Sequence, residues 1–431
     1  MSIIKVPYHK SYRNFTVPDG DILDIVKPSY AKYENINGET EQKIISSALA
    51  NPIDKPKLEN IVDKSSNVAI IVDDNTRPTP TERILPLILK KINKSGVKDQ
   101  NITIIFFFVF YRKLSVQEEK KLLGNKIWNK YRIIQHESRN KNDLIKLSTS
   151  NKKINKWAYN ADLRIMIGFI KSHDIAGYSG GAKSILPGLA DYNTILNNHS
   201  FTNLSDSATG IGILAGNPCR EEMEKMALAV EPNFIINVVL NRENKVIKAV
   251  AGDVISAHRT GVKLYNEIAM VKVDKMAHIV MACCPYPTDS NLYQALYGAA
   301  VTFKVSHPIV KKGGVIILVA HCPEGIGDES FTKLIMDNKK PDQLISTISK
   351  ENFSQLGQWA GQLWADLLNY ANVILVSGEK IPDSYFAQTP MKKASSLNKA
   401  WEMGKNILGE NNIRGYFLPQ APLTLPLAKN D

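Results

Sequence analysis

The segment from Ser172 to Ser184 has the residue types of a loop that binds an anion or a cofactor. It reads SHDIAGYSGGAKS, with His173 near its start and Lys183 near its end. Glycines let a backbone adopt positive φ and approach a ligand closely, so that amide groups face an anion. The glycines of this segment are Gly177, Gly180 and Gly181. A loop that only turns needs neither the lysine nor the histidine, so we predict a site with a reactive Lys183.

Two histidines flank this lysine in the sequence. His173 lies ten residues before Lys183, and His199 lies sixteen residues after it. Neutral imidazole is both the usual general base and a good ligand for nickel, copper or zinc. Two histidines without a third ligand nearby in sequence do not make a closed zinc site. We therefore expect the pair to converge on Lys183 as a base, a metal ligand or both.

A second polar group follows the apolar run Val68–Val72. Side chains of this kind at the carboxyl end of a strand can hold a phosphate, a sugar hydroxyl or a carboxylate, and arginine does so with two hydrogen bonds. The alternative is a polar turn before a helix, with an aspartate or threonine as the cap. The candidate residues are Asp74, Asn75, Thr76 and Arg77.

A third group lies at the start of an expected helix in the C-terminal half. Tyr293 and Tyr297 share one helix face at a spacing of four residues, with Gln294 beside them. This face could present hydrogen-bond donors to a ligand. A packed aromatic face is the alternative, and the spacing alone fits both.

The elements that position these groups alternate between apolar strands and helices. Continuous apolar, β-branched runs followed by helical patterns are typical of parallel sheets covered on both faces. Ligands of such sheets bind outside the carboxyl ends of the strands. The predicted strands are Val68–Val72, Ile102–Phe110, Leu163–Ile170, His278–Ala282, Val315–Ala320 and Val373–Val376.

Two helices have recognisable start signals. Ser115 and Glu118 form a capping box that opens a helix over Val116–Leu123. The apolar spacing of Ile84–Ile92 is also helical, and we expect Pro86 to lie in the first turn of that helix.

The chain length favours more than one domain. With 431 residues, of which 44% are hydrophobic, the chain can form two sizeable cores. A short charged stretch at 272–275 places a boundary near residue 270. We predict the α/β class, with two α/β domains over residues 1–270 and 271–431, largely parallel sheets, and a cofactor and substrate cleft between them.

Composition narrows the partners. The net charge of +12 favours a small anionic substrate or a phosphorylated cofactor. No basic stripe interleaved with aromatics and no zinc-finger spacing is present, so we expect no nucleic-acid partner. No apolar run is long enough to span a bilayer and the N-terminus has no apolar signal core, so we expect a cytoplasmic protein without a membrane partner. The four scattered cysteines are expected to be buried thiols.

The segment from Gly177 to Ser184 is also one residue away from a P-loop, GxxxxGK[ST]. Ala182 stands where that motif needs glycine, and Pro187 lies where the P-loop helix would continue. Because proline inside a helix costs about 3 kcal/mol, a different cradle for an anion or a cofactor is favoured. A nucleotide-dependent phosphotransferase remains an alternative.

Together these motifs resemble those of the nickel-dependent lactate racemase family of 2-hydroxyacid racemases and epimerases. Asp74 to Pro78 resembles the DxTRP strand end of the family, and His173 to Gly188 is similar to its most specific motif. Asn198-His199-Ser200 and Asn291-Leu292-Tyr293-Gln294 also match, in the same order along the chain.

The resemblance implies two α/β domains around a cleft and an isomerase that uses a nickel-pincer nucleotide. This cofactor, pyridinium-3,5-bisthiocarboxylic acid mononucleotide, would be joined to Lys183 through a thioamide, with His199 as the nickel ligand. Asp74 to Arg77 would hold the cofactor. His173 would take the hydroxyl proton of a 2-hydroxy acid while hydride passes to the cofactor and returns to the other face. The implied partners are the substrate and the proteins that make the cofactor.

The chain departs from the family pattern at two positions. Tyr111 stands where the family has a second catalytic histidine, and Tyr297 stands where its lactate enzymes have a substrate-binding lysine. An unperturbed tyrosine, with a pKa near ~10, is a poor base at neutral pH, but a nearby cation such as Arg112 lowers such a pKa. We expect substrate contacts from Tyr293, Gln294 and Tyr297, and a 2-hydroxy acid other than lactate. A homologue that binds the cofactor or a hydroxy acid without catalysis is the alternative. The sequence leaves the oligomeric state open.

Overall fold

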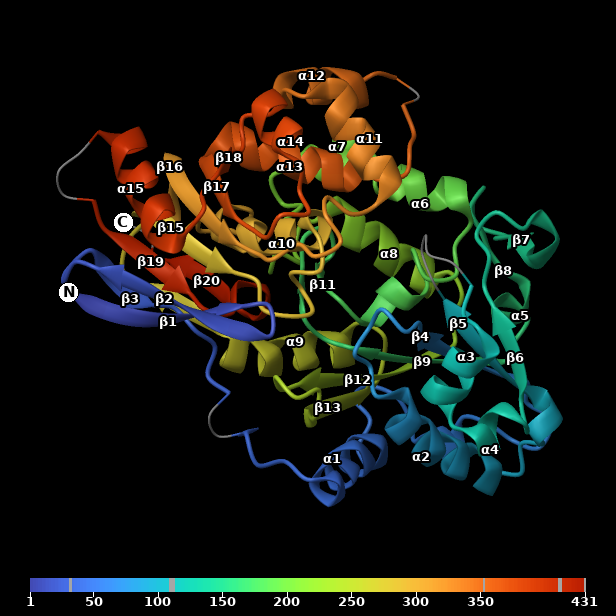
Figure 1. Ribbon diagram of the computed structural model, residues 1–431. Helices are drawn as coiled ribbons and strands as arrows, with labels where there is room; N and C mark the ends of the chain where they lie inside the picture. Colours follow the sequence, from blue (N-terminus) through green and yellow to red (C-terminus); the bar gives the residue numbers. More distant parts are fainter. Residues whose placement is uncertain (31–32, 108–112, 352, 410–412, 430–431) are drawn as a thin grey trace.

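The computed structural model describes residues 1–30, 33–107, 113–351, 353–409 and 413–429, which form two six-stranded sheets with helices around them (Figure 1). The first sheet is parallel except for its edge pair β12 and β13, which is antiparallel. Its order is β13 (Val246–Gly252), β12 (Asn233–Leu240), β9 (Leu163–Phe169), β4 (Val68–Asp73), β5 (Ile102–Phe107) and β6 (Arg132–Gln135).

The second sheet is parallel throughout. Its order is β18 (Lys392–Lys393), β17 (Asn372–Val376), β16 (Val310–Val319), β15 (Ala277–Cys283), β19 (Gly415–Leu418) and β3 (Ile22–Ile25). All six predicted strands are present, and the predicted α/β class with largely parallel sheets is confirmed. Residues 108–110 of the second predicted strand lie outside the described residues.

The N-terminal strands lie with the second sheet. The hairpin of β1 (Ser2–Tyr8) and β2 (Ser11–Val17) packs Val6 and Phe15 into the core around Met281 and Trp401. With β3 at the edge of the same sheet, the first 25 residues pack in the C-terminal half. The domain boundary near residue 270 stays a prediction. It does not account for the N-terminal strands that pack with the second sheet.

Helices cover both faces of the sheets. In β4, Val68, Ile70 and Val72 face one core, whereas Ala69 and Ile71 face another. Strands buried on both faces explain why the sequence shows continuous apolar runs instead of alternation. The longer helices are α1 (Gly38–Ala50), α2 (Thr81–Lys94), α3 (Val116–Leu123), α8 (Pro218–Leu228), α9 (Ser256–Ala269), α10 (Leu292–Phe303), α11 (Glu329–Asn338), α12 (Pro341–Ile348), α13 (Gln358–Tyr370) and α15 (Leu397–Leu408).

The predicted helix starts are confirmed in one case and corrected in the other. Ser115 and Glu118 form the capping box of α3, which spans the predicted residues. Helix α2 begins at Thr81, so Pro86 lies in its second turn, and the prediction of a first-turn proline is wrong. The buried face of α2, which includes Ile84 and Ile88, outweighs the backbone hydrogen bond that this proline removes.

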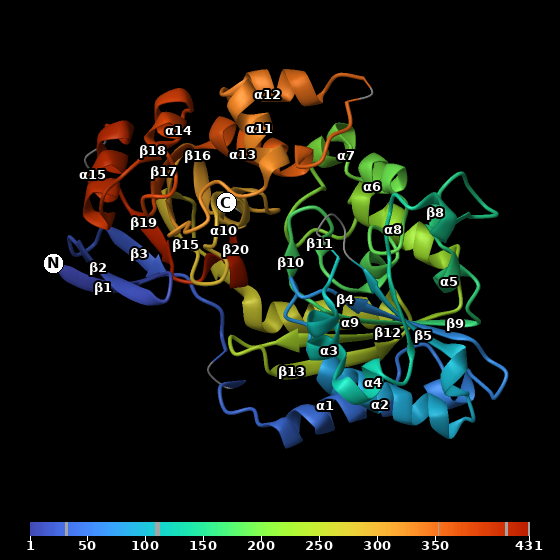
Figure 2. The ribbon, with the colours of Figure 1, turned by 45° about the vertical axis from the view of Figure 1, so that its right-hand side comes forward.

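The strand order of the first sheet indicates a ligand site at the carboxyl ends of β4 and β9. From β4 the chain moves outward to β5 and β6, then returns to β9 on the other side of β4. The loops after β4 and β9 therefore diverge, which is the arrangement that forms a binding crevice in open α/β sheets. The loop after β9 carries β10 (Ser172–His173) and β11 (Gly177–Tyr178), which lie between the two sheets in Figure 2.

Two further expectations concern cysteines and membranes. The four cysteines are free and buried, as predicted. Among the described residues, no helix is long and apolar enough to cross a membrane.

Candidate active site

A buried arginine fixes the loop after β9. Arg220 of α8 has no exposed surface, and its guanidinium donates hydrogen bonds to backbone carbonyls of the loop. Its Nε lies 3.0 Å from the oxygen of Ala176 and its Nη1 lies 3.4 Å from that of Gly180, while Nη2 donates to Tyr178. A cation that satisfies several carbonyls at once holds the loop in one conformation.

Two side chains from neighbouring elements complete this support. Asn237 of β12 accepts a hydrogen bond from the amide of Gly181 at 2.8 Å. His258 of α9 places Nε2 at 2.8 Å from the carbonyl of Ser179. The loop is therefore held from three sides before any ligand binds.

The loop glycines are required by contact with protein atoms. A Cβ at Gly177, where φ is +71°, would lie 2.0 Å from the oxygen of Ile213. A Cβ at Gly180 would lie 2.6 Å from Asn237, and one at Gly181 would lie 2.8 Å from His258. The predicted positive φ is confirmed at all three glycines, and the atoms that come close to their α carbons are protein atoms. The prediction that the loop amides face an anion stays a prediction.

We expect Gly177→Ala to destabilise the fold by about 2 kcal/mol or more, because it adds a steric clash to a strained positive φ. Urea unfolding measures this change. Gly313→Ala is the matched control, since its φ is +78° and no atom lies within 4 Å of the added Cβ. Equal losses in the two variants would show that φ strain alone accounts for the effect.

The backbone around Lys183 is not that of a P-loop. Residues Gly181–Ser184 form a single 3-10 turn, and the next α-helix, α6, starts only at Tyr192 (Tyr192–Asn198). A P-loop places its lysine at the start of an α-helix whose amides hold phosphate. The phosphotransferase alternative is therefore not favoured.

Lys183 is an almost buried amine with an altered proton affinity. Its side chain is 9% exposed. Burial, followed by the positive charge of Arg77, lowers the pKa of Lys183 to about 7, while Asp73 opposes this shift. A large fraction of the amine is therefore neutral, and nucleophilic, near neutral pH.

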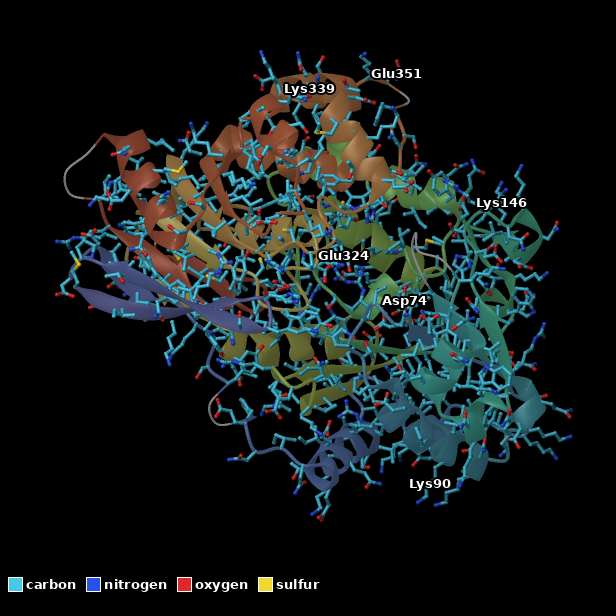
Figure 3. All side chains as sticks on the ribbon, in the orientation of Figure 1. Asp74, Lys90, Lys146, Glu324, Lys339 and Glu351 are labelled. Atoms are coloured by element: carbon cyan, nitrogen blue, oxygen red, sulfur yellow. The ribbon has the colours of Figure 1, made fainter. Side chains whose placement is uncertain are left out.

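The strand-end group after β4 combines a polar turn with the cation Arg77. Asp74 accepts a hydrogen bond from the amide of Thr76 at 2.9 Å, and Asn75 donates to Glu118 at 2.8 Å. These contacts fit the turn that was the alternative for this group. The positive charge of Arg77 depresses the pKa values of both Lys183 and His173. Figure 3 shows Asp74 near the middle of the molecule.

Asp73 is a buried carboxyl beneath this turn. Burial raises the pKa of Asp73 to about 6, although a hydrogen bond from Thr79 and the charge of Arg77 oppose the shift. Asp73 is the last residue of β4. Its negative charge raises the pKa of Lys183 and so favours the protonated amine.

His173 is held at its Nδ1 atom. This nitrogen lies 3.1 Å from the carboxylate of Asp174, and 3.2 and 3.3 Å from the amides of Ile175 and Ala176. The carboxylate stabilises a protonated Nδ1 and the amides stabilise an unprotonated one, so both neutral tautomers have a partner. Burial and then the charge of Lys183 keep the pKa of His173 well below its usual value, so the ring is neutral.

His199 ends helix α6 and is 5% exposed. Burial and then Lys183 lower the pKa of His199 to about 3, so the ring is neutral and one of its nitrogens has a lone pair for a metal. Among the described residues, its buried Nδ1 has no hydrogen-bond partner. The ring lies edge-on to Trp359 at 5.8 Å between centroids, and Gln358 donates to the His199 carbonyl at 3.0 Å.

The tyrosines of α10 connect the second half to this centre. Trp359 donates to the hydroxyl of Tyr293 at 3.3 Å. The hydroxyl of Tyr297 donates to the carbonyl of Ser172 at 2.6 Å, so it is engaged within the protein. Gln294 is exposed, and its amide hydrogen bonds to the cap residue Asn291.

Electrostatic effects join Arg77, Lys183 and the two histidines, and Tyr293 and Tyr297 contact Trp359 and Ser172. Asn75 and Gln294 make their side-chain and cap contacts elsewhere, and Tyr111 lies outside the described residues. Sequence reasoning missed several contributors. Asp174 lies inside the segment that was singled out, and Asn237 lies in the apolar strand β12, where a polar residue was itself a signal. Arg220 lies in α8, whose several charged residues gave no such signal. The missed residues are Lys171, Asp174, Arg220, Asn237, His258 and Trp359.

Two family models match the chain in succession. The lactate racemase N-terminal domain matches residues 8–211, and the lactate racemase C-terminal domain matches residues 271–416.

Two individual proteins and one solved structure are also similar to this chain. The lactate racemase of Thermoanaerobacterium thermosaccharolyticum is 32% identical over 418 residues, which cover 96% of each chain. The lactate racemase of Lactiplantibacillus plantarum is 33% identical over 93% of this chain and 94% of its own. The structure of the Thermoanaerobacterium lactate racemase apoprotein superposes over the full length of both chains with a TM-score of 0.88.

Proposed function

The chain belongs to the lactate racemase family, and from this we propose that it racemises or epimerises a 2-hydroxy acid with a nickel-pincer nucleotide on Lys183. The relatives indicate an isomerase. Two observations carry the finer proposal: Lys183 is a nearly buried amine with a pKa of about 7, and it acts electrostatically on His199, whose buried Nδ1 has no hydrogen-bond partner among the described residues.

The residues fit this cofactor. No group of three or more histidine, cysteine, aspartate or glutamate side chains able to hold a metal occurs among the described residues. A lone imidazole such as His199 therefore needs further ligands from a bound group, and a pincer with two sulfur donors supplies them. Lys183 would carry the cofactor, His199 would ligate nickel, and Asp74, Asn75, Thr76 and Arg77 would hold the nucleotide.

When bound, the nickel-pincer pyridinium supplies an acceptor and donor of hydride at the substrate carbon. His173 would take the hydroxyl proton and later return it, and Asp174 would hold its Nδ1 proton so that Nε2 is free to accept. Arg77 would bind an anionic group of the cofactor or substrate. Tyr178 of the loop after β9 and Leu296 of α10 belong to one buried apolar core, which joins the two halves beside this loop.

The two departures from the family pattern, Tyr111 and Tyr297, lead to proposals about the second base and the substrate. We propose Tyr111 as the second base, a role that requires a cation to lower its pKa. Tyr293, Gln294 and Tyr297 would line the substrate position. Because Tyr297 adds an aromatic surface where lactate enzymes have a lysine, we propose a 2-hydroxy acid other than lactate. The cofactor-making proteins stay expected partners, and a cytoplasmic location stays a prediction.

The proposal is tested on protein produced together with the nickel-pincer biosynthetic enzymes. We expect nickel in the purified protein, a nucleotide-sized mass on the peptide containing Lys183, and racemisation of one or more acids in a chiral screen of 2-hydroxy acids. His199→Ala should lose nickel. An unmodified Lys183, with a control family member loaded in the same cells, would contradict the cofactor proposal. Efficient turnover of lactate would contradict the substrate proposal.

A further inference from the structure

Lys171 is a half-buried cation that has no anionic partner in the part of the chain that the structure describes. It follows the end of β9 and directly precedes β10. Among the described residues, its ammonium makes no hydrogen bond and no ion pair. Its one recorded contact is with the ring of Tyr297, whose centroid lies 4.9 Å from Nζ. Holding a charge away from water without a partner is costly, so this arrangement points to a ligand that pairs with it.

Lys171 lies beside the candidate active site. Side chains two residues apart in an extended segment point to the same face, which places Lys171 with His173. The charged or ionisable groups that act on it are Arg77, Asp174 and the thiol of Cys284. Burial and Arg77 lower the pKa of Lys171 to about 8, so most of it is still protonated at pH 7.

The nearest carboxylate is already engaged. Asp174 pairs with Nδ1 of His173 at 3.1 Å, and its pKa is raised by burial. Asp73 is buried and bonded to Thr79. Three cations, Lys171, Arg77 and Lys183, therefore face these two carboxyl groups, and an anionic ligand would balance the charge.

We infer that Lys171 binds the carboxylate of the substrate, with the ring of Tyr297 as the wall beneath it. The ring is fixed for this role because the Tyr297 hydroxyl is bonded to Ser172, whose own hydroxyl lies 3.1 Å from that of Tyr265. This inference rests on the proposed function and names the residue that selects acids over neutral compounds. An apolar group of the acid would lie against the aromatic wall.

The test measures binding of 2-oxobutanoate and its uncharged amide by calorimetry, with loaded protein. We expect Lys171→Met to weaken binding of the acid by about ten- to a hundredfold, as for loss of a charge-assisted hydrogen bond, and to leave binding of the amide unchanged. Lys171→Arg should restore most of the affinity for the acid. Lys90→Met, at an exposed position of α2 on the outer edge of the molecule (Figure 3), is the control.

Several outcomes would overturn the inference. Equal acid affinity in wild type and Lys171→Met, an equal loss for acid and amide, or no binding of the acid by wild type would each do so. Loss of the Lys183 adduct in Lys171→Met alone would assign Lys171 to the cofactor phosphate instead. Intact adduct and nickel with unchanged acid binding would reject Lys171 and leave the proposed function standing. Absence of the adduct from wild type would reject the cofactor proposal, and the binding comparison would still be read on the unloaded chain.

Discussion

Lys183→Ala is expected to remove the covalent cofactor and reduce racemase activity to the background rate, because the variant has no amine at the attachment position. Intact-protein mass spectrometry and chiral chromatography measure the two losses. The unloaded wild-type protein should show that the neutral amine of Lys183 is reactive near neutral pH. The neutral fraction of an amine rises with pH, so acylation of Lys183 should increase through its pKa of about 7, whereas an ordinary lysine amine, with a pKa near ~10.4, reacts at higher pH.

Two variants distinguish the loss of the cofactor attachment point from the loss of the positive charge at Lys183. Lys183→Arg keeps the positive charge, but its guanidinium stays protonated and cannot be acylated, so it should also lack the adduct. Lys90→Ala should be loaded and active, since that lysine is exposed on α2. An adduct that appears on Lys171 in the Lys183→Ala variant would contradict a single attachment site.

Much of the fold could be predicted because its strands are buried on both faces. Val68–Val72 is apolar throughout and Leu163–Ile170 is apolar except for Arg164 and Gly168, and this pattern distinguishes parallel strands well. The return of residues Ser2–Ile25 to the second sheet was not predictable, since short edge strands depend on partners far away in the sequence. Pro86 was misplaced because tertiary burial of α2 decides where that helix begins.

The candidate site was predicted in its residue types but not in its contacts. His173, Lys183 and His199 were recognised as chemically competent, and the structure brings their charges close enough to shift one another's pKa values. The positive φ of the loop glycines was predicted, but their tight contacts with other parts of the protein were not. Only coordinates show that Ile213 fills the space beside Gly177. Contacts such as Trp359 with His199 join residues far apart in the chain, and no local pattern indicates them.

His173→Ala is expected to lower kcat by about 10²- to 10⁴-fold, the range for loss of a general acid–base group, with the Lys183 adduct and nickel retained. The reason is that the neutral imidazole of His173 is the group proposed to accept the hydroxyl proton, and alanine offers no acceptor in its place. Burial and Lys183 keep its pKa well below the usual histidine value, so activity should not fall at mildly acidic pH through protonation of this ring. Chiral chromatography of the loaded enzyme, with nickel analysis of the same sample, measures both quantities.

Asp174→Asn distinguishes a positioned base from a merely buried histidine. An asparagine in that place can donate to Nδ1, which favours the tautomer with the proton on Nε2, and this tautomer cannot accept a proton there. Asp174 lies 3.1 Å from Nδ1, so we expect a fall in kcat with little change in KM or in cofactor content. If kcat is unchanged, the amides of Ile175 and Ala176 alone set the tautomer and His173 donates its Nε2 proton, which would assign proton removal to Tyr111.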